Sequence, residues 1–452
     1  MSPRSLTPRP TQRGAACALA LISLCATARA GNDDEVFVGN RAAMMGGAVA
    51  AAVRDGSAAW YNPAGLGGVQ RDQIDASASV YTLRAYSAPG YMSSVDGDSA
   101  DAAVREFFSV PSQVAYERRL APGLGLGLAY FAPKSTNLLL RQQLTTSDAD
   151  VTSRWQLTLA QTEIQHRLVA ALGYQLGSGL RVGASLVGGY DTGVTSLAVF
   201  GAVQDDQQVT RTVSSSALGT FNRASLELGL GAQLEVTPAL HLAVFGRSPT
   251  LQLRRLGDSY FSTAEGRHPT GQEATLTGGA DRLELDDGLA IVRGGRIGFG
   301  LGYRVAEACL VTAEADLQPA LSNDEANVVR EAVFNARLGV YYQIKGLLAV
   351  GAGVFTDRSP DRLSAGEIST AGDFYGGSLG FELGERHMLS ELEREKSLVF
   401  STVIALRYAH SSARTTRIIV NPSPDAAEQF QSAPGDMEIH ELSLYLGSGF
   451  AF

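Results

Sequence analysis

Apolar and polar residues alternate over long stretches of this chain. In the segment 224–236, "ASLELGLGAQLEV", every even position is Ala, Leu or Val and every odd position is polar or glycine. Because successive side chains of a β-strand point to opposite faces, one face of this strand is wholly apolar. The alternation is also longer than the strands of most soluble sheets, which average about 5–6 residues. It recurs around 297–304, 334–342 and 398–408.

Fourteen such segments can be counted along the chain. They lie at 71–87, 111–120, 123–135, 153–176, 179–201, 217–236, 239–262, 288–306, 308–318, 330–344, 347–357, 371–384, 397–413 and 437–452. Short turns, as at 121–123 and 177–179, alternate with long polar loops, as at 88–110, 136–152, 202–216 and 263–287. This arrangement, with an even strand count, is typical of outer-membrane barrels. The sequence therefore predicts an all-β fold, a 14-stranded antiparallel transmembrane β-barrel over residues 71–452.

The last strand supports the same interpretation. Its sequence, "LSLYLGSGFAF", places Leu442, Leu444, Leu446, Phe450 and Phe452 on one face and ends on an aromatic residue. It resembles the terminal signal that the barrel-assembly machinery of the outer membrane recognises, which makes that machinery an expected partner. An ordinary edge strand that ends on Phe452 is the alternative.

Composition adds an export signal and removes several classes of function. Residues 1–30 combine a basic leader, the apolar run "AACALALISLCA" and "ARA" at the end, and so predict a signal peptide. Without them the net charge moves from −9 to −13 and Cys309 is the one remaining cysteine, interpreted as a small apolar residue in a strand. The acidity argues against nucleic-acid binding. No later apolar run reaches the ~18 residues of a membrane helix.

A compact motif lies between the signal peptide and the first strand. Within "GGAVAAAVRDGSAAWYNPAGLGG" (46–68), Pro63 ends any preceding helix and Asn62 suits a tight turn. The motif residues are Trp60, Tyr61, Asn62, Pro63, Ala64, Gly65 and Leu66. With the fourteen strands, they resemble the FadL family of outer-membrane transporters of long-chain fatty acids and other hydrophobic compounds. The segment "FGRSP" (245–249) resembles a weaker signature of that family.

The resemblance implies that residues 31–70 fold into the lumen as a hatch. A capping helix or a plain linker is the alternative. Glycines that share parity with the polar residues of their strands are expected to point inward and to form a seat for the hatch, because glycine in a strand often marks the close approach of another backbone. Those singled out are Gly229, Gly231, Gly298, Gly300 and Gly302. Relief of crowding in a curved barrel is the alternative.

Four inward positions are candidates for ligand binding: Phe245 as an apolar wall, and Arg247, Arg337 and Arg407 as cations for a carboxylate head, since a buried unpaired charge is costly. Each arginine can instead pair with a lumen Asp or Glu.

The expected function is passive, hatch-gated uptake of hydrophobic small molecules, with outer-membrane lipid and lipopolysaccharide around the barrel. The alternatives are a general pore, a structural barrel without hydrophobic specificity, or a barrel enzyme. Scattered histidines and the absence of a G-x-S-x-G motif favour no metal site, no cofactor and no catalysis.

Overall fold

The computed structural model describes residues 36–452 except 111–112, 149–150, 206–209, 269–274, 325, 327, 346–347, 362–369, 389–396, 422 and 424–429. The predicted signal peptide lies outside the described residues. Three short helices precede the sheet: α2 (Asn40–Met44), α3 (Ala58–Tyr61) and η1 (Pro63–Gly68). Among the described residues, no helix is both long and apolar enough to cross a bilayer.

Most of the rest of the described chain is β-structure. The strands are β1 (Gln73–Ser94), β2 (Ser99–Val110), β3 (Gln113–Ala121), β4 (Leu124–Asp148), β5 (Val151–Leu176), β6 (Leu180–Asp205), β7 (Thr210–Glu235), β8 (Leu240–Arg247), β9 (Thr250–His268), β10 (Thr275–Asp287), β11 (Ala290–Arg293), β12 (Arg296–Ala306), β13 (Cys309–Gln318), β14 (Leu321–Asn323), β15 (Val328–Arg330), β16 (Val333–Lys345), β17 (Leu348–Asp357), β18 (Thr370–Met388), β19 (Ser397–Val420) and β20 (Phe430–Ala451). Within the described ranges, β14 and β15 form a separate hairpin and the other eighteen segments form one sheet.

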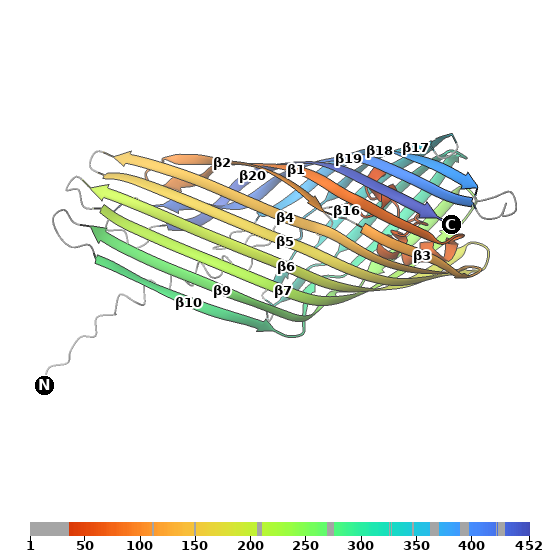
Figure 1. Ribbon diagram of the computed structural model, residues 1–452, viewed down its shortest axis with the longest axis horizontal. Helices are drawn as coiled ribbons and strands as arrows, with labels where there is room; N and C mark the ends of the chain where they lie inside the picture. The colour runs from red at the N-terminus through yellow and green to blue at the C-terminus, as the bar shows by residue number, and fades with distance from the viewer. Residues whose placement is uncertain are drawn as a thin grey trace.

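This sheet closes into a barrel (Figure 1). The closing pair is β1 with β20, which pair from Gln73 opposite Ala451 to Ser87 opposite Glu438 with one irregularity between Ser77 and Ser79. The all-β barrel is therefore confirmed, but a wholly antiparallel sheet is not, because Met92–Ser94 of β1 run parallel to Ile418–Val420 of β19. The cause is an irregularity in β1 between Ala88 and Met92, which bends the end of the strand away from its earlier course.

Several of the segments predicted as long loops are strands instead. β4 runs to Asp148 and β5 starts at Val151, and β6 and β7 extend in the same way to Asp205 and from Thr210. The barrel is consequently elongated, because β4, β5, β6, β7, β9 and β10 extend far toward the end opposite the C-terminus (Figure 1). These extensions are polar on average, so the alternation of the sequence does not predict them as membrane strands.

A band of aromatic rings on the outer face marks where the alternation inverts. On β5, Leu168 and Tyr174 face outward and are 66% and 49% exposed. Nearer the Val151 end of β5, a direction called upward from here on, the His166 ring stacks on the rings of Tyr130 and Tyr190. The Tyr130 hydroxyl and His166 Nδ1 are hydrogen bonded at 2.8 Å. Farther along β5 the outward residues are mostly polar (Thr162, Thr158, Gln156, Arg154 and Thr152, with Ile164 and Ala160 between them), whereas the inward ones, Leu159, Leu157 and Trp155, are buried.

The change of polarity along β5 marks the height of the apolar outer band. Tyr174 and His166 are eight positions apart, which at about 3.3 Å per residue and a tilt near 40° gives an apolar band of about 20 Å. On β5, the outward residues between His166 and Tyr174 suit hydrocarbon, whereas those between Val151 and His166 are mostly polar and the inward residues Trp155, Leu157 and Leu159 are apolar and buried. Elsewhere on the barrel the register of β19 and β20 sets His410 opposite His440, with ring centroids 4.7 Å apart.

The wall has a seam near this aromatic band. β3 pairs with β4 as far as Gln113 opposite Phe131, and the register of β4 against β5 then shifts between Phe131 and Lys134. Pro133 lies in this irregularity and has no N–H to donate to a neighbouring strand. Among the described residues β2 pairs with β1, and no hydrogen-bonded ladder joins it to β4, although the two strands lie close together.

Candidate functional site: the N-terminal segment and the arginine cavity

Residues 36–69, here called the N-terminal segment, lie against the inward face of the barrel wall at its C-terminal end (Figure 1). The fold of the segment follows from its small residues and its one proline. Gly46 and Gly47 adopt positive φ angles of 63° and 78°, which turns the chain back after α2. Asn62, at φ −156°, is extended before Pro63, and η1 then begins.

Asn62 fixes the segment to itself and to the wall. Its side chain is fully buried and accepts a hydrogen bond from the Ala64 N–H at 3.2 Å. Its Nδ2 donates to the carbonyls of Ala50 (3.1 Å) and Ala232 (3.2 Å), and Ala232 belongs to β7. A single amide thus joins two turns of the segment to one barrel strand.

Inward glycines admit the backbone of the segment. A Cβ at Gly231 would overlap the Asn62 side chain, and a Cβ at Gly183 would overlap the backbone of Pro63. At Gly300 it would come within 3.1 Å of the Ala51 nitrogen. A Cβ at Gly125 would likewise overlap Leu66, one at Gly173 would overlap Pro63 and Gly67, and one at Gly353 would overlap Met45. At Gly302, by contrast, a Cβ would make an ordinary contact of 3.5 Å with the Ala51 Cβ.

Two of the glycines expected in this seat do not belong to it. The space beside Gly298 is filled by the ring of Phe245, which is its cross-strand partner. The space beside Gly229 is filled by the hydroxyl of Ser185, again the residue opposite. Cross-strand neighbours cover these glycines because side chains of facing positions lie only about 5 Å apart.

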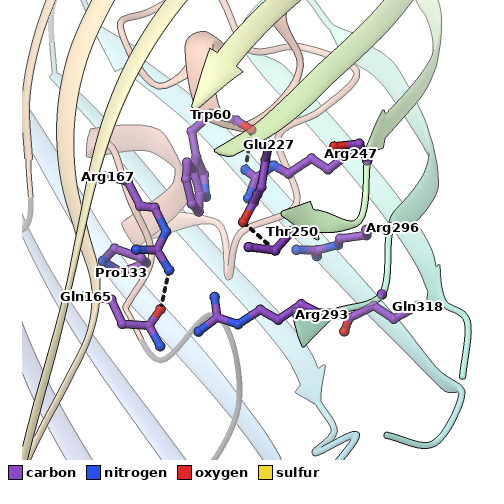
Figure 2. Close-up of a pocket in the computed structure, with 12 residues that line it drawn as sticks. Trp60, Pro133, Gln165, Arg167, Glu227, Arg247, Thr250, Arg293, Arg296 and Gln318 are labelled. Atoms are coloured by element: carbon purple, nitrogen blue, oxygen red, sulfur yellow. Dashed lines mark hydrogen bonds between the residues drawn. The ribbon is translucent and has the colours of Figure 1, made fainter. Parts of the chain in front are cut away.

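A polar cavity adjoins Trp60 on the inner side of the wall (Figure 2). It holds about 450 Å³ of unfilled space, part of it open to solvent. Its lining consists of Trp60, Pro133, Gln165, Arg167, Glu227, Arg247, Ser248, Thr250, Arg293, Gly294, Arg296 and Gln318. We call it the arginine cavity.

Arg247 connects the arginine cavity to the motif. Its guanidinium lies 3.5 Å from the centre of the Trp60 ring and donates to the Trp60 carbonyl at 2.5 Å (Figure 2). The Trp60 ring in turn meets Phe131 edge-on at 5.5 Å, at the point where β3–β4 pairing ends. The Val36 N–H also donates to the Pro133 carbonyl at 3.1 Å. The segment is therefore joined both to β8 and to the edge of the seam.

Three of the four predicted ligand residues lie elsewhere. Phe245 covers Gly298 and does not line the arginine cavity. Arg337 donates to Glu314 (3.1 Å) and Asp316 (2.7 Å), and Arg407 donates to Glu441.

Arg407 also lies over the rings of Phe37 and Phe355. For Arg337 and Arg407 the structure therefore shows the pairing with lumen carboxylates that the sequence left open.

Three lining arginines were not singled out from the sequence: Arg167, Arg293 and Arg296. Arg167 occupies an odd position of β5, as the other inward residues of this strand do, so the alternation alone predicts that its side chain points inward. Arg293 and Arg296 flank the Gly294–Gly295 break between β11 and β12, where parity gives no direction.

Carboxylates gather where the segment meets β1 and β3. The Gly56 N–H donates to Asp75 Oδ2 at 3.1 Å, and Asp55 accepts from the Ser57 N–H at 3.1 Å. Glu117, opposite Gln73 on β3, is 2% exposed. Among the described residues no group of three or more His, Cys, Asp or Glu is placed to hold a metal ion.

Comparison with known proteins gives a fold but no sequence relative. No family model matches the chain, and no curated protein matches it in sequence. The solved structure of a Pseudomonas aeruginosa FadL homologue covers 94% of this chain and 100% of its own, with a TM-score of 0.58 at 12% identity. The chain has the fold of the FadL-type transporters.

The Pseudomonas putida toluene transporter TodX has the same FadL-type fold. Its structure covers 92% of this chain and 98% of its own, with a TM-score of 0.54 at 13% identity. The resemblance read from the N-terminal motif and the alternation is thus confirmed at the level of the fold.

Proposed function

We propose that this protein is an outer-membrane transporter for the passive uptake of hydrophobic small molecules, gated by the N-terminal segment. The observation that carries the proposal is the packing of residues 36–69 onto inward glycines of the wall, beside a cavity bounded by Trp60. A general pore needs no such obstruction. The apolar outer band and the fold shared with the FadL homologue and TodX support the location and the class of cargo.

The proposal includes fourteen membrane-crossing strands. Three groups of segments are counted as single crossings, because the pieces of each group follow one another along the same neighbouring strands, with register shifts at some of the breaks. β2 and β3 both pair along β1, β8 and β9 both pair along β7, and β10, β11 and β12 follow one another along β9 and β8. With the N-terminus of β1 and the C-terminus of β20 at one end, the short turns lie on the periplasmic side.

The seam between β2 and β4 is the proposed exit. Pro133 lines the arginine cavity and also lies at the β4 irregularity, so a solute in the cavity is beside the unpaired edges. Displacement of Trp60 from Phe131 would open a path sideways into the bilayer. Phe452, half exposed on the outer face at the end of the last strand, is the proposed signal for the assembly machinery.

An uptake assay tests the function. Proteoliposomes that contain the full chain are expected to accumulate labelled toluene or fatty acid down its gradient faster than empty liposomes. Deletion of residues 36–69 is expected to raise small-ion conductance in planar bilayers sharply. A wild-type conductance equal to that of the deletion would identify a general pore, and uptake equal to that of empty liposomes would refute hydrophobic transport.

A further inference from the structure

The upper end of β1 leaves its neighbour in the wall. β1 pairs with β20 as far as Ser87, and its register against β2 shifts between Ala88 and Met92. Pro89, in this irregularity, has no N–H to donate, and Gly90 has a positive φ of 58°. The strand therefore bends at Pro89–Gly90, and β2 follows it as the other half of a hairpin. We call residues 88–102 the β1–β2 hairpin.

Beyond the bend, β1 reaches the far edge of β19. Residues Met92–Ser94 pair in parallel with Ile418–Val420, and the Val95 N–H donates to the Val420 carbonyl at 3.0 Å. β20 already holds one edge of β19 at this height, since Val420 is opposite Phe430. β1 must therefore use the other edge, which β18 holds lower down. To reach that edge, β1 crosses both β20 and β19.

The crossing lies on the inner side of the barrel. The outward residues of β20 at this height, Asp436 and Glu438, are exposed. The inward residues, Met437 and Ile439, are buried at 3% and 4% exposure. Because only the inner face of β20 is covered, the β1–β2 hairpin folds into the mouth of the barrel at the end opposite the C-terminus.

Apolar side chains hold the β1–β2 hairpin in this place. Tyr91 and Met92 are 2% and 0% exposed, and Ala102 on the returning strand is buried as well. All three belong to one apolar cluster with Trp155 and Leu157 of the extended upper part of β5. The hairpin and the tall strands thus share one apolar core at this end of the barrel.

The backbone attachment of the β1–β2 hairpin to the wall is slight. Among the described residues above Ser87, it consists of the three positions paired with β19 and the hydrogen bond from Val95. No ladder joins β2 to β4 on the other flank. A segment with few hydrogen bonds to its surroundings opens at low free energy, and the bend at Pro89–Gly90 is a ready hinge.

We propose that the β1–β2 hairpin is the outer gate of the barrel, hinged at Pro89–Gly90, and that apolar solutes open it. The inference rests on the proposed transport function and adds a second barrier to the N-terminal segment. An apolar solute can replace Tyr91 and Met92 against the same apolar core, so that the core stays out of water when the hairpin leaves. A sugar or an ion offers no such replacement and does not favour the open state.

A disulfide that locks the β1–β2 hairpin tests the gate in the full chain. Ser93 and Ile419 are register partners on strands about 4.8 Å apart, a separation that a disulfide spans. The pair Ser93→Cys and Ile419→Cys is introduced together with Cys309→Ala, because Cys309 is the only other cysteine after residue 30. In proteoliposomes the oxidised protein is expected to take up labelled toluene at least tenfold more slowly than the same protein after reduction.

The matched control is the pair Ser412→Cys and Glu438→Cys, register partners between β19 and β20 with exposed side chains. Its disulfide joins two strands that stay paired when the gate opens, so oxidation should leave uptake unchanged. Equal uptake by the oxidised and reduced hairpin pair, with cross-linking complete by mass spectrometry, would overturn the proposal.

A second readout needs no transport. Met437→Cys, in the Cys309→Ala protein, places a thiol on the inner face of β20 where the β1–β2 hairpin crosses it. A water-soluble maleimide is expected to react with this thiol at least tenfold faster when toluene is present, and no faster with glucose. The outward Glu438→Cys should react at one rate in all three conditions. A rate at position 437 that toluene does not change would also refute the gate.

The two readouts separate the gate from the function beneath it. If toluene speeds the labelling of the Met437→Cys protein but the wild-type chain takes up no solute, the gate stands and the transport function is wrong. If the wild-type chain takes up toluene and oxidation of the hairpin pair has no effect, the transporter stands and the gate is wrong.

Discussion

The substitution Gly231→Ala tests whether the N-terminal segment is held by the close approach of backbones. A methyl group at this position would overlap the Asn62 side chain and come within 3.1 Å of Pro63 Cδ. Asn62 must then leave its place and give up its hydrogen bonds to the Ala50 and Ala232 carbonyls and from the Ala64 N–H. The Ala50 carbonyl keeps a hydrogen bond, because Gln233 still donates to it at 2.9 Å. The groups left without their hydrogen-bond partner are therefore the Asn62 side-chain amide and the Ala232 carbonyl.

The size of the effect follows from those three contacts. At about 1 kcal/mol for each net hydrogen bond, the segment loses about 3 kcal/mol of docking free energy. Because about 1.4 kcal/mol corresponds to a factor of ten, the population of undocked segment should rise about 100-fold. Barrel stability should change little, since the register of β7 with β6 and β8 does not involve the Asn62 side chain.

Tryptic cleavage in proteoliposomes is the measurement. Arg41 and Arg54 are the only tryptic sites between residues 36 and 69, so cleavage there reports undocking. The control is Gly188→Ala on the adjacent strand β6, where a methyl group would have nothing nearer than the Leu168 carbonyl at 3.9 Å. If Gly231→Ala is cleaved no faster than Gly188→Ala, and its bilayer conductance is also unchanged, the reasoning about the seat is wrong.

Two further predictions concern the barrel itself. Leu168→Arg, on the lipid-facing band, should lower the unfolding free energy of the inserted barrel by about 2–4 kcal/mol, measured by urea unfolding from vesicles. Thr162→Arg, outward on the same strand above His166, should change that free energy little. Equal losses at both sites would contradict the inversion of polarity. Arg407→Ala leaves buried Glu441 with Arg84 as its one remaining cationic partner among the contacts described, and should cost about 3 kcal/mol, seen as earlier unfolding in heat-modifiability gels. Arg254→Ala, which removes an exposed pair with Asp286, is its control and should leave the gel transition in place.

Alternation by itself was enough to predict the barrel wall. A strand whose neighbours are lipid on one side and a polar lumen on the other must alternate, so Ala224–Val236 or Leu442–Phe452 predict both the strand and its outward face. The glycines at 231 and 300 could also be interpreted from parity alone, because a bare inward position leaves room for another backbone. Turns with small residues at 121–123 and 177–179 are turns in the structure, with Gly123 and Gly177 at positive φ.

Other features depended on which strands become neighbours. Whether Gly298 faces the N-terminal segment or the ring of Phe245 is set by the pairing of β12 with β8, and no property of residue 298 contains that information. Arg337 and Arg407 have the same parity as Arg247, yet only Arg247 reaches Trp60, since the carboxylates of Glu314, Asp316 and Glu441 lie within reach of the other two.

The chain therefore determined by itself which residues face lipid and which face inward, because that choice depends only on positions two residues apart along one strand. The extended upper sheets, the seam at Pro133 and the arginine cavity were decided by tertiary structure. Each of them brings together strands that are distant in sequence, and the energy of a buried charge or of a close backbone contact depends on those distant partners.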